Sequence, residues 1–169
     1  MLHGDFSRIR RYVYRIALMG SMAAIVGTTA GCTAQHPYQR ESMDPPGRYA
    51  SPYYTHAVAT RGGKTLYVSG QWSYDPSGKL VGRGDLKAQT IQAFTNLKAV
   101  VEAAGARTSE IVKINTYVVG YEEKNLAELG AGLNICFGTS RDYASTVVGV
   151  QSLAREGMLI EVEAIVVTR

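Results

Sequence analysis

The last hydrophobic segment of the chain, Leu159–Val167, alternates side chains across two faces with the two-residue period of a β-strand. Glu161 and Glu163 fall on one face, whereas the other face is uniformly apolar. A carboxylate on an apolar strand costs free energy unless another group pairs with it, binds it or solvates it. The strand therefore indicates either a functional site or a half-exposed sheet whose two glutamates face water.

Other segments also have the pattern of strands. Thr55–Thr60 and Thr65–Ser69 flank Gly62-Gly63, a glycine pair that is typical of a β-hairpin turn. Ile111–Val119 and Thr146–Val150 are predicted to be strands as well.

Two segments repeat apolar residues at three- and four-residue spacing, which predicts amphipathic helices. The first helix is expected to start at Asp85, whose side chain can cap an N-terminus, and to stop at Gly105. The second covers Glu122–Phe137. Gly130 and Gly132 would each weaken it by about 1 kcal/mol relative to alanine if they lie mid-helix.

The resulting order, β-β-α-β-α-β-β, predicts an α+β fold with one sheet and both helices packed on one face. The helices are expected to cover the apolar face of the last strand. The face with Glu161 and Glu163 also carries Leu159, Ile165 and Val167, a mixture poorly suited to full exposure. We therefore expect this face to be buried against a partner subunit, with ligand sites at the seam.

The N-terminus has the features of an export signal. Residues 1–31 contain four arginines and one acid, followed by a short apolar run from Ile16 to Gly27 that is too short for an ordinary membrane span. Thr29-Ala30-Gly31-Cys32 resembles a bacterial lipobox, although threonine replaces the usual leucine. We expect a lipoprotein lipidated at Cys32; cleaved soluble export or an uncleaved start remain alternatives.

Residues 32–48 are polar and contain three prolines, so they are predicted to be a linker before a domain at 49–169. The whole chain has a formal charge of +4, but residues 33–169 hold 14 bases and 13 acids. The basic character therefore belongs largely to the leader. The domain has no basic patch interleaved with aromatic residues, and no nucleic-acid partner is expected.

Metal and cofactor chemistry has no support in the sequence. The two cysteines, Cys32 and Cys136, do not form a C-x-x-C pair, and the three histidines are scattered. Cys136 falls on the apolar stripe of the second predicted helix, which favours a buried structural thiol over a redox sensor. His56 is interpreted as a structural or surface residue. We expect neither a metal nor an organic cofactor.

Several short motifs, in their order and spacing, resemble the Rid family, also called YjgF-like or L-PSP endoribonuclease-like. The resemblance covers about residues 50–169. The matching segments are Tyr67-Val68-Ser69-Gly70-Gln71, Gln89-Thr90, Asn96-Leu97, Ile111-Val112-Lys113, Gly149-Val150 and Glu161-Val162-Glu163-Ala164.

The resemblance implies a chorismate-mutase-like fold and a homotrimer with clefts between subunits. In the best-studied branch of the family, enamine and imine intermediates are hydrolysed to 2-keto acids and ammonia. There a glutamate positions the attacking water, an arginine holds the substrate carboxylate, and a Ser-Gly turn and a tyrosine line the cleft.

These roles transfer only in part. The resemblance assigns the glutamate to Glu161, the turn to Ser69 and Gly70, and the tyrosine to Tyr54, with Tyr53 as the choice if the register slips by one. It also places Val147 where the deaminase branch has a cysteine, and Gly130 where the second helix contributes an asparagine.

The substrate-clamping arginine is absent, and Ser145 occupies its position. Arginine forms a charged, two-pronged contact with a carboxylate, whereas serine offers one neutral hydroxyl. Loss of such a contact in a desolvated cleft should lower kcat/KM by more than about a hundredfold. Arg141, from the preceding loop, is the one nearby replacement, although a solvated loop arginine is the default interpretation.

Two functional hypotheses follow. The first is an exported Rid-type hydrolase acting on imines or similar small electrophiles, with Glu161 as the catalytic residue and a substrate preference altered by Ser145. The second is a non-catalytic trimeric lipoprotein that binds a small metabolite. Ribonuclease activity is suggested only by one family name, and no His/Lys pair or basic groove supports it.

Overall fold

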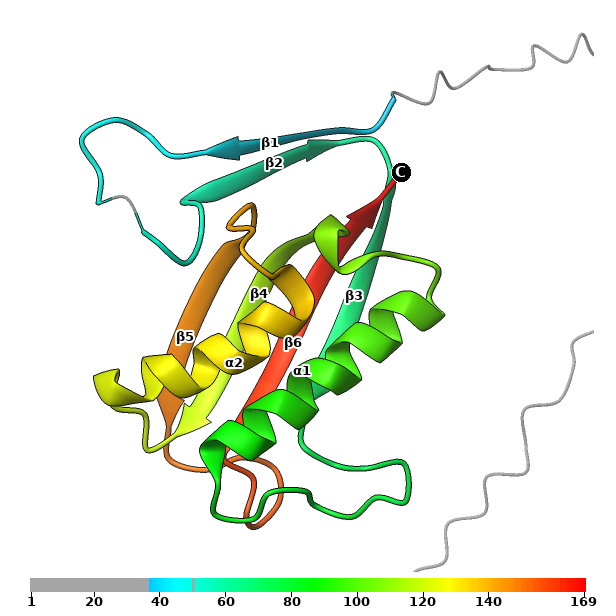
Figure 1. The fold of residues 1–169 in the computed structure, drawn as a ribbon. Coiled ribbons are helices and arrows are strands. Elements are labelled where there is room, and N and C mark those ends of the chain that lie inside the picture. Colours follow the sequence, from blue (N-terminus) through cyan, green and yellow to red (C-terminus); the bar gives the residue numbers. More distant parts are fainter. Residues whose placement is uncertain (1–36, 50) are drawn as a thin grey trace, which may run out of the picture. The chain divides into compact units, whose positions relative to one another are not determined.

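The computed structural model describes residues 37–49 and 51–169. The expected export signal, Cys32 and the first part of the expected linker lie outside the described residues. The elements, coloured along the chain in Figure 1, are β1 (Gln39–Met43), β2 (Ala57–Arg61), β3 (Lys64–Gln71), α1 (Leu86–Ala103), η1 (Thr108–Glu110), β4 (Ile111–Val119), η2 (Glu123–Asn125), α2 (Leu126–Phe137), β5 (Ala144–Val150) and β6 (Ile160–Thr168), where η marks a 3₁₀ turn.

Four strands form a mixed sheet in the order β3-β6-β4-β5. Strand β6 is antiparallel to both of its neighbours, and β4 and β5 are parallel. Helices α1 and α2 lie on the same face of this sheet (Figure 1). The prediction of an α+β fold with both helices on one face of a mixed sheet is therefore confirmed.

The period-two pattern of the last strand correctly predicted its buried side. Ile160, Val162 and Val166 are fully buried and Ala164 nearly so, whereas Glu161 and Glu163 are half-buried on the other face. The apolar face packs under α1, whose side chains in the core are Ala93, Phe94, Leu97 and Val101. Neither α1 nor α2 covers the opposite face of the sheet (Figure 1), which is called the open face here.

Helix α1 starts and stops as its sequence predicts. The Asp85 carboxylate accepts a hydrogen bond from the backbone N–H of Ala88 at 2.9 Å, which satisfies one of the donors left unpaired in the first turn. Gly105 has φ +77°, a left-handed conformation that ends the helix at little cost because glycine has no Cβ.

The expected hairpin at Gly62-Gly63 is wrong in its pairing. Strands β2 and β3 do follow one another through these glycines, but β2 pairs with β1 and β3 pairs with β6. Both glycines have a positive φ, +68° and +79°, and form the turn between the two strands. Gly63 also lies close to β6, because a Cβ at this position would be 2.3 Å from the backbone oxygen of Thr168.

The expected linker at 32–48 contains a strand. Residues Gln39–Met43 form β1, which pairs antiparallel with β2 over five residues. Its side chains are mostly exposed, so it lacks the hydrophobic alternation by which strands are recognised. Arg40 fixes it instead, because its guanidinium donates to the backbone oxygens of Ser109, Ile111 and Asp142.

Two motif positions of the sequence serve the fold. Gln89 is fully buried; its Nε2 donates to the oxygens of Gly82 and Gly157 at 3.1 and 2.8 Å, and its Oε1 accepts from the N–H of Leu159 at 2.8 Å. Gln89 thereby attaches α1 to the start of β6. In the same helix, Asn96 Nδ2 donates at 2.8 Å to the backbone oxygens of Trp72 and Tyr74.

The two glycines of α2 have different environments. A Cβ at Gly132 would lie 2.3 Å from Cδ2 of Phe94 and 2.6 Å from Cγ2 of Thr90, so its absence permits α1 and α2 to approach. A Cβ at Gly130 would meet nothing within 4 Å. One of the two glycines is thus required by packing, and the other is not.

We predict opposite effects of alanine at these two positions. Gly132→Ala should lower the free energy of unfolding by about 1–2 kcal/mol, because overpacking against buried Phe94 outweighs the gain in helix propensity. Gly130→Ala should raise it by about 0.5–1 kcal/mol. Urea unfolding monitored by circular dichroism would check both, and equal effects of the two substitutions would contradict the packing argument.

Candidate functional site

Strand β3 contains a bulge opposite Glu163. Val68 is paired with Ala164 and Gln71 with Val162, so both Ser69 and Gly70 lie opposite a single residue of β6. A bulge of this kind leaves one residue unpaired and redirects its neighbours. Bulges are frequent next to active sites, where they change the direction of a side chain or expose backbone groups.

Gly70 lies directly against the carboxylate of Glu161. A Cβ at Gly70 would be 1.7 Å from Oε1 and 2.6 Å from Cδ of Glu161. The φ angle of Gly70 is not in the left-handed region, so the requirement for glycine is steric rather than conformational. The structure therefore brings together three residues singled out by sequence, Ser69, Gly70 and Glu161, on neighbouring strands.

Glu163 is held by two donors on β4. Its Oε1 accepts hydrogen bonds from Asn115 Nδ2 at 2.8 Å and from Tyr117 Oη at 2.9 Å. The pKa of Tyr117 is raised, first by this hydrogen bond to Glu163 and then by burial and by the two glutamate charges. The Glu163 side chain is thus held in place by hydrogen bonds from β4 of the same chain. Glu161 lies two residues before it on β6.

A pocket of about 270 Å³ opens on this face of the sheet. Its lining comes from three strands and combines a lysine, a carboxylate and small polar groups. The residues that line it are Tyr67, Val68, Ser69, Lys113, Asn115, Glu163, Ala164 and Ile165.

Sequence reasoning missed the contribution of β4 to this face. Lys113, Asn115 and Tyr117 are polar at alternate positions, between residues that are mostly buried and apolar, so the same period-two signal was present there. Burial lowers the pKa of Lys113, whose Nζ donates to Thr146 Oγ1 at 2.5 Å.

Glu161 has an altered acidity. Its pKa is raised above the ordinary value of a glutamate, mainly by burial and secondly by the charge of Glu163. Among the described residues, no lysine or arginine forms an ion pair with it. A carboxylate with these properties is a better proton acceptor than a solvated one, as general-base chemistry requires.

Ser145 lies away from Glu161 within one chain. On β5 it is paired with Ile114 of β4, whose side chain is buried in the core, whereas Glu161 is paired with Tyr117 on the open face. Because paired residues point to the same side, Ser145 and Glu161 project from opposite faces, with β4 between their strands.

The predicted tyrosine, Tyr54, lies near the start of β5. The N–H of Thr55 donates to the oxygen of Tyr143 at 3.1 Å, which places the Tyr54 segment beside this strand. Tyr54 is partly buried against the core and meets His56 edge-to-face, whereas Tyr53 is exposed. The predicted residues therefore form two groups: a glutamate half (Ser69, Gly70, Glu161) and a serine half (Tyr54, Ser145).

The guanidinium of Arg141 donates hydrogen bonds to three backbone oxygens. Its Nε donates to Pro52, and its Nη1 donates to Gly138 at 3.2 Å and to Ser140 at 2.8 Å. These contacts fasten the loop after α2 to the segment before Tyr54. Within one chain, the guanidinium thus has a structural role at the edge of the serine half.

Other candidate chemistry is inconspicuous in the described part of the chain. Residues 37–49 and 51–169 contain no group of three histidine, cysteine or acidic side chains that could hold a metal ion. Cys136 is buried, as its place on the apolar stripe predicted. Burial raises its pKa to about 12, which makes the thiol a poor nucleophile.

None of the described helices is long and apolar enough to cross a membrane.

We predict that Glu161→Gln stabilises the protein at neutral pH. Because the folded pKa of Glu161 is raised, its protonated form is favoured by the fold, and stability is lost as pH rises from about 4.3, the unfolded value, through the folded pKa. The variant should therefore have the higher Tm at pH 7 and the same Tm as the wild type near pH 3. Equal Tm values at both pH values would contradict the shift.

We predict that Gly70→Ala moves the Glu161 carboxylate at little cost in stability. The new Cβ meets only the end of a flexible side chain, so the free energy of unfolding should fall by less than about 1 kcal/mol. The pKa of Glu161 should shift toward its ordinary value as the carboxylate moves outward. Carboxyl ¹³C NMR titration measures this shift, and Ser69→Ala, which adds no atoms, is the matched control.

The chain is similar in sequence to known proteins. A sequence model described as Endoribonuclease L-PSP matches residues 47–168. A RutC family protein of Pyrococcus horikoshii is 32% identical over 114 residues, covering 68% of this chain and 87% of its own. A 2-iminobutanoate/2-iminopropanoate deaminase of Dermatophagoides farinae is 34% identical over 118 residues, covering 69% of this chain and 88% of its own.

A solved structure also shows the fold. The Rid family protein YyfB of Yersinia pestis superimposes with a TM-score of 0.72 at 37% sequence identity, over 76% of this chain and 98% of its own. This fold, the family-model match and the similarity to the deaminase all lead to one assignment: the chain belongs to the Rid (YjgF-like, L-PSP) family.

Proposed function

We propose that this protein is a Rid-type hydrolase that converts reactive imines, or closely related small electrophiles, to carbonyl compounds and ammonia. The observation that carries the proposal is the Glu161 carboxylate, which lies against Gly70 with a raised pKa. The similarity to a chain named as a 2-iminobutanoate/2-iminopropanoate deaminase supports the reaction class.

In the proposed mechanism, Glu161 acts as a general base. A water molecule attacks the imine carbon and gives a proton to the Glu161 carboxylate, which passes it to the imine nitrogen to form a carbinolamine. The same carboxylate then transfers the hydroxyl proton of the carbinolamine to its nitrogen as the C–N bond breaks, so that imine and water give carbonyl compound and ammonia. A base whose pKa is raised toward neutrality is suited to both proton transfers.

The complete site is proposed to form between copies of the chain. The glutamate half and the serine half lie on different faces within one chain, so one pocket can include both only if two chains contribute. Exposed hydrophobic residues on the open face support such an assembly: Tyr67 is 77% exposed, and Val148 is 39% exposed. A homotrimer is the assembly that the family resemblance implies.

Ser145 is proposed to change the substrate preference. Without a guanidinium at this position, a substrate carboxylate has no two-pronged charged partner, and Arg141 is already bound to three backbone oxygens. We therefore expect imines that lack an α-carboxylate to be preferred. A metabolite-binding protein without turnover is the second candidate, favoured by the same missing arginine.

The proposed location is outside the cytoplasm, with a lipid on Cys32. The basic leader, short apolar run and lipobox-like Thr29-Ala30-Gly31-Cys32 support this location. Cleavage without lipidation is the alternative.

The reaction is tested with 2-aminoacrylate generated in situ and with an uncharged imine as a second substrate. We predict that the uncharged imine is hydrolysed faster than in buffer and that Glu161→Gln lowers kcat by about 10²-fold or more. No acceleration with either substrate would contradict the hydrolase proposal. In that case, ligand-dependent increases in Tm without turnover would identify the binding protein.

The role of Ser145 is tested by restoring the guanidinium. Ser145→Arg should raise kcat/KM for 2-aminoacrylate by about 10- to 100-fold, while the rate with the uncharged imine changes little. Ser145→Gln, which adds bulk without charge, is the matched control and should give no gain. An equal gain in both variants would show that volume, not charge, limits activity.

A further inference from the structure

A second pocket, of about 620 Å³, lies at the connection between α1 and β4. It shares no lining residue with the pocket beside Glu163, so a ligand bound here would not contact that lining. Three arginines, one glutamate and two hydroxyl residues line it: Tyr38, Arg40, Arg107, Ser109, Glu110 and Arg169.

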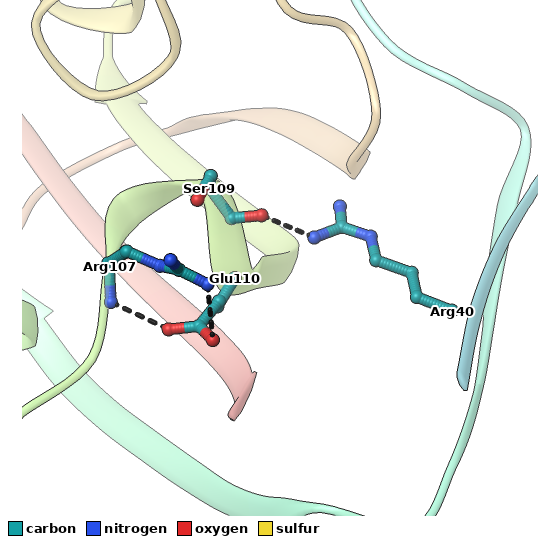
Figure 2. Close-up of polar contacts among 4 residues, drawn as sticks. All are labelled: Arg40, Arg107, Ser109 and Glu110. Carbon is teal, nitrogen blue, oxygen red and sulfur yellow. Dashed lines mark hydrogen bonds and ion pairs between the residues drawn. The ribbon is translucent and has the colours of Figure 1, made fainter. Parts of the chain in front are cut away.

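The only carboxylate side chain of this lining is already paired. Glu110 Oε2 accepts the backbone N–H of Arg107 at 2.9 Å, and Oε1 accepts Nη2 of the same arginine at 3.2 Å (Figure 2). Glu110 is only 8% exposed, and these contacts close the turn before β4. Its charge is therefore matched by Arg107 and leaves the other arginines uncompensated.

Arg40 is a fixed positive charge with neutral partners. Its guanidinium donates to the backbone oxygens of Ser109, Ile111 and Asp142, the first of which is drawn in Figure 2. Among the described residues, no acidic side chain pairs with Arg40 or Arg169. The side chains of the lining include three guanidinium groups and one carboxylate, so their formal charges sum to +2.

Tyr38 adds an unused hydrogen-bonding group. Its ring packs over Gly63, where a Cβ would lie 2.8 Å from Cδ2 of the tyrosine. Its hydroxyl oxygen is buried and has no hydrogen-bond partner within the described structure. Since a buried hydroxyl without a partner costs free energy, a ligand acceptor atom at this position would relieve that cost.

From these observations we propose that this pocket binds a small oxyanion carrying about two negative charges, either a phosphate group or a dicarboxylate. Guanidinium groups bind both through paired N–H donors, and the Tyr38 hydroxyl can donate to a further oxygen. The volume lies within the range of metabolite pockets. The contacts of Arg40 explain how β1 is held, and those of Arg107 close the turn with Glu110, but neither accounts for Arg169 and the unpaired tyrosine hydroxyl in the same pocket.

The test is calorimetric titration of the full-length protein with inorganic phosphate and, separately, with succinate, at constant ionic strength maintained with chloride. Saturable binding of either probe at millimolar concentration or below is expected. The probe that binds more tightly distinguishes phosphate from carboxylate ligands. No saturable binding of either probe by the wild-type protein overturns the proposal.

Three variants locate the binding. Tyr38→Phe removes only the hydroxyl and should weaken binding about 3- to 10-fold without lowering the Tm of the unliganded protein. Arg169→Gln, which leaves the Arg107–Glu110 pair intact, should weaken it about 10-fold. Arg83→Gln, which removes a solvent-exposed arginine outside the pocket, should leave binding unchanged.

Backbone amide NMR gives a readout that does not depend on these variants. The amide signals of Ser109 and Glu110 should shift during the titration, whereas those of Ser69 and Gly70 at the bulge should not. Shifts confined to other residues, or equal weakening in Arg83→Gln and Arg169→Gln, would show nonspecific anion binding and overturn the proposal.

Discussion

The carboxylate of Glu161 occupies the space that a side chain at Gly70 would need, and the glutamate half depends on this contact. The bulge at Ser69-Gly70 allows β3 to pass a strand that carries two acidic side chains on one face. Asn115 and Tyr117 hold the neighbouring Glu163 by hydrogen bonds, and the charge of Glu163 disfavours a second charge on Glu161. Gly70 on β3 thus leaves room for the Glu161 carboxylate, and the charge of Glu163 on β6 raises its pKa, whereas the hydrogen bonds from β4 hold Glu163.

The order of strands separates the proposed site into two parts. Strand β4 lies between β5 and β6, and the register assigns Ser145 and Glu161 to opposite faces. Under the proposed function, a single chain therefore carries the general base on one face and the serine half on the other, and activity requires assembly. Arg141 fastens the loop at the edge of the serine half.

Much of the fold could be predicted because burial on one face leaves a periodic signal. The strand at Leu159–Val167 was found in this way. The cap at Asp85 was found from the residue type, because an aspartate side chain can accept a hydrogen bond from the first turn. Strand β1 could not be, because its side chains are exposed and its pairing depends on the distant contacts of Arg40. The sequence also identified Gly70 and Glu161, but not their contact, and it missed Asn115 and Tyr117, although their alternate spacing was visible. Which face Ser145 occupies depends on strand register, which no local pattern specifies.

Gln89 and Asn96 belong to the motifs by which the chain resembles its family, yet both use their amides to hold backbone oxygens of the scaffold. A glutamate at position 89 would place a carboxylate against the oxygens of Gly82 and Gly157, so selection for folding alone can maintain the amide. These motif residues therefore indicate a shared fold rather than a shared activity. A descendant could exchange its substrate, or lose catalysis entirely, while these signature positions stayed the same.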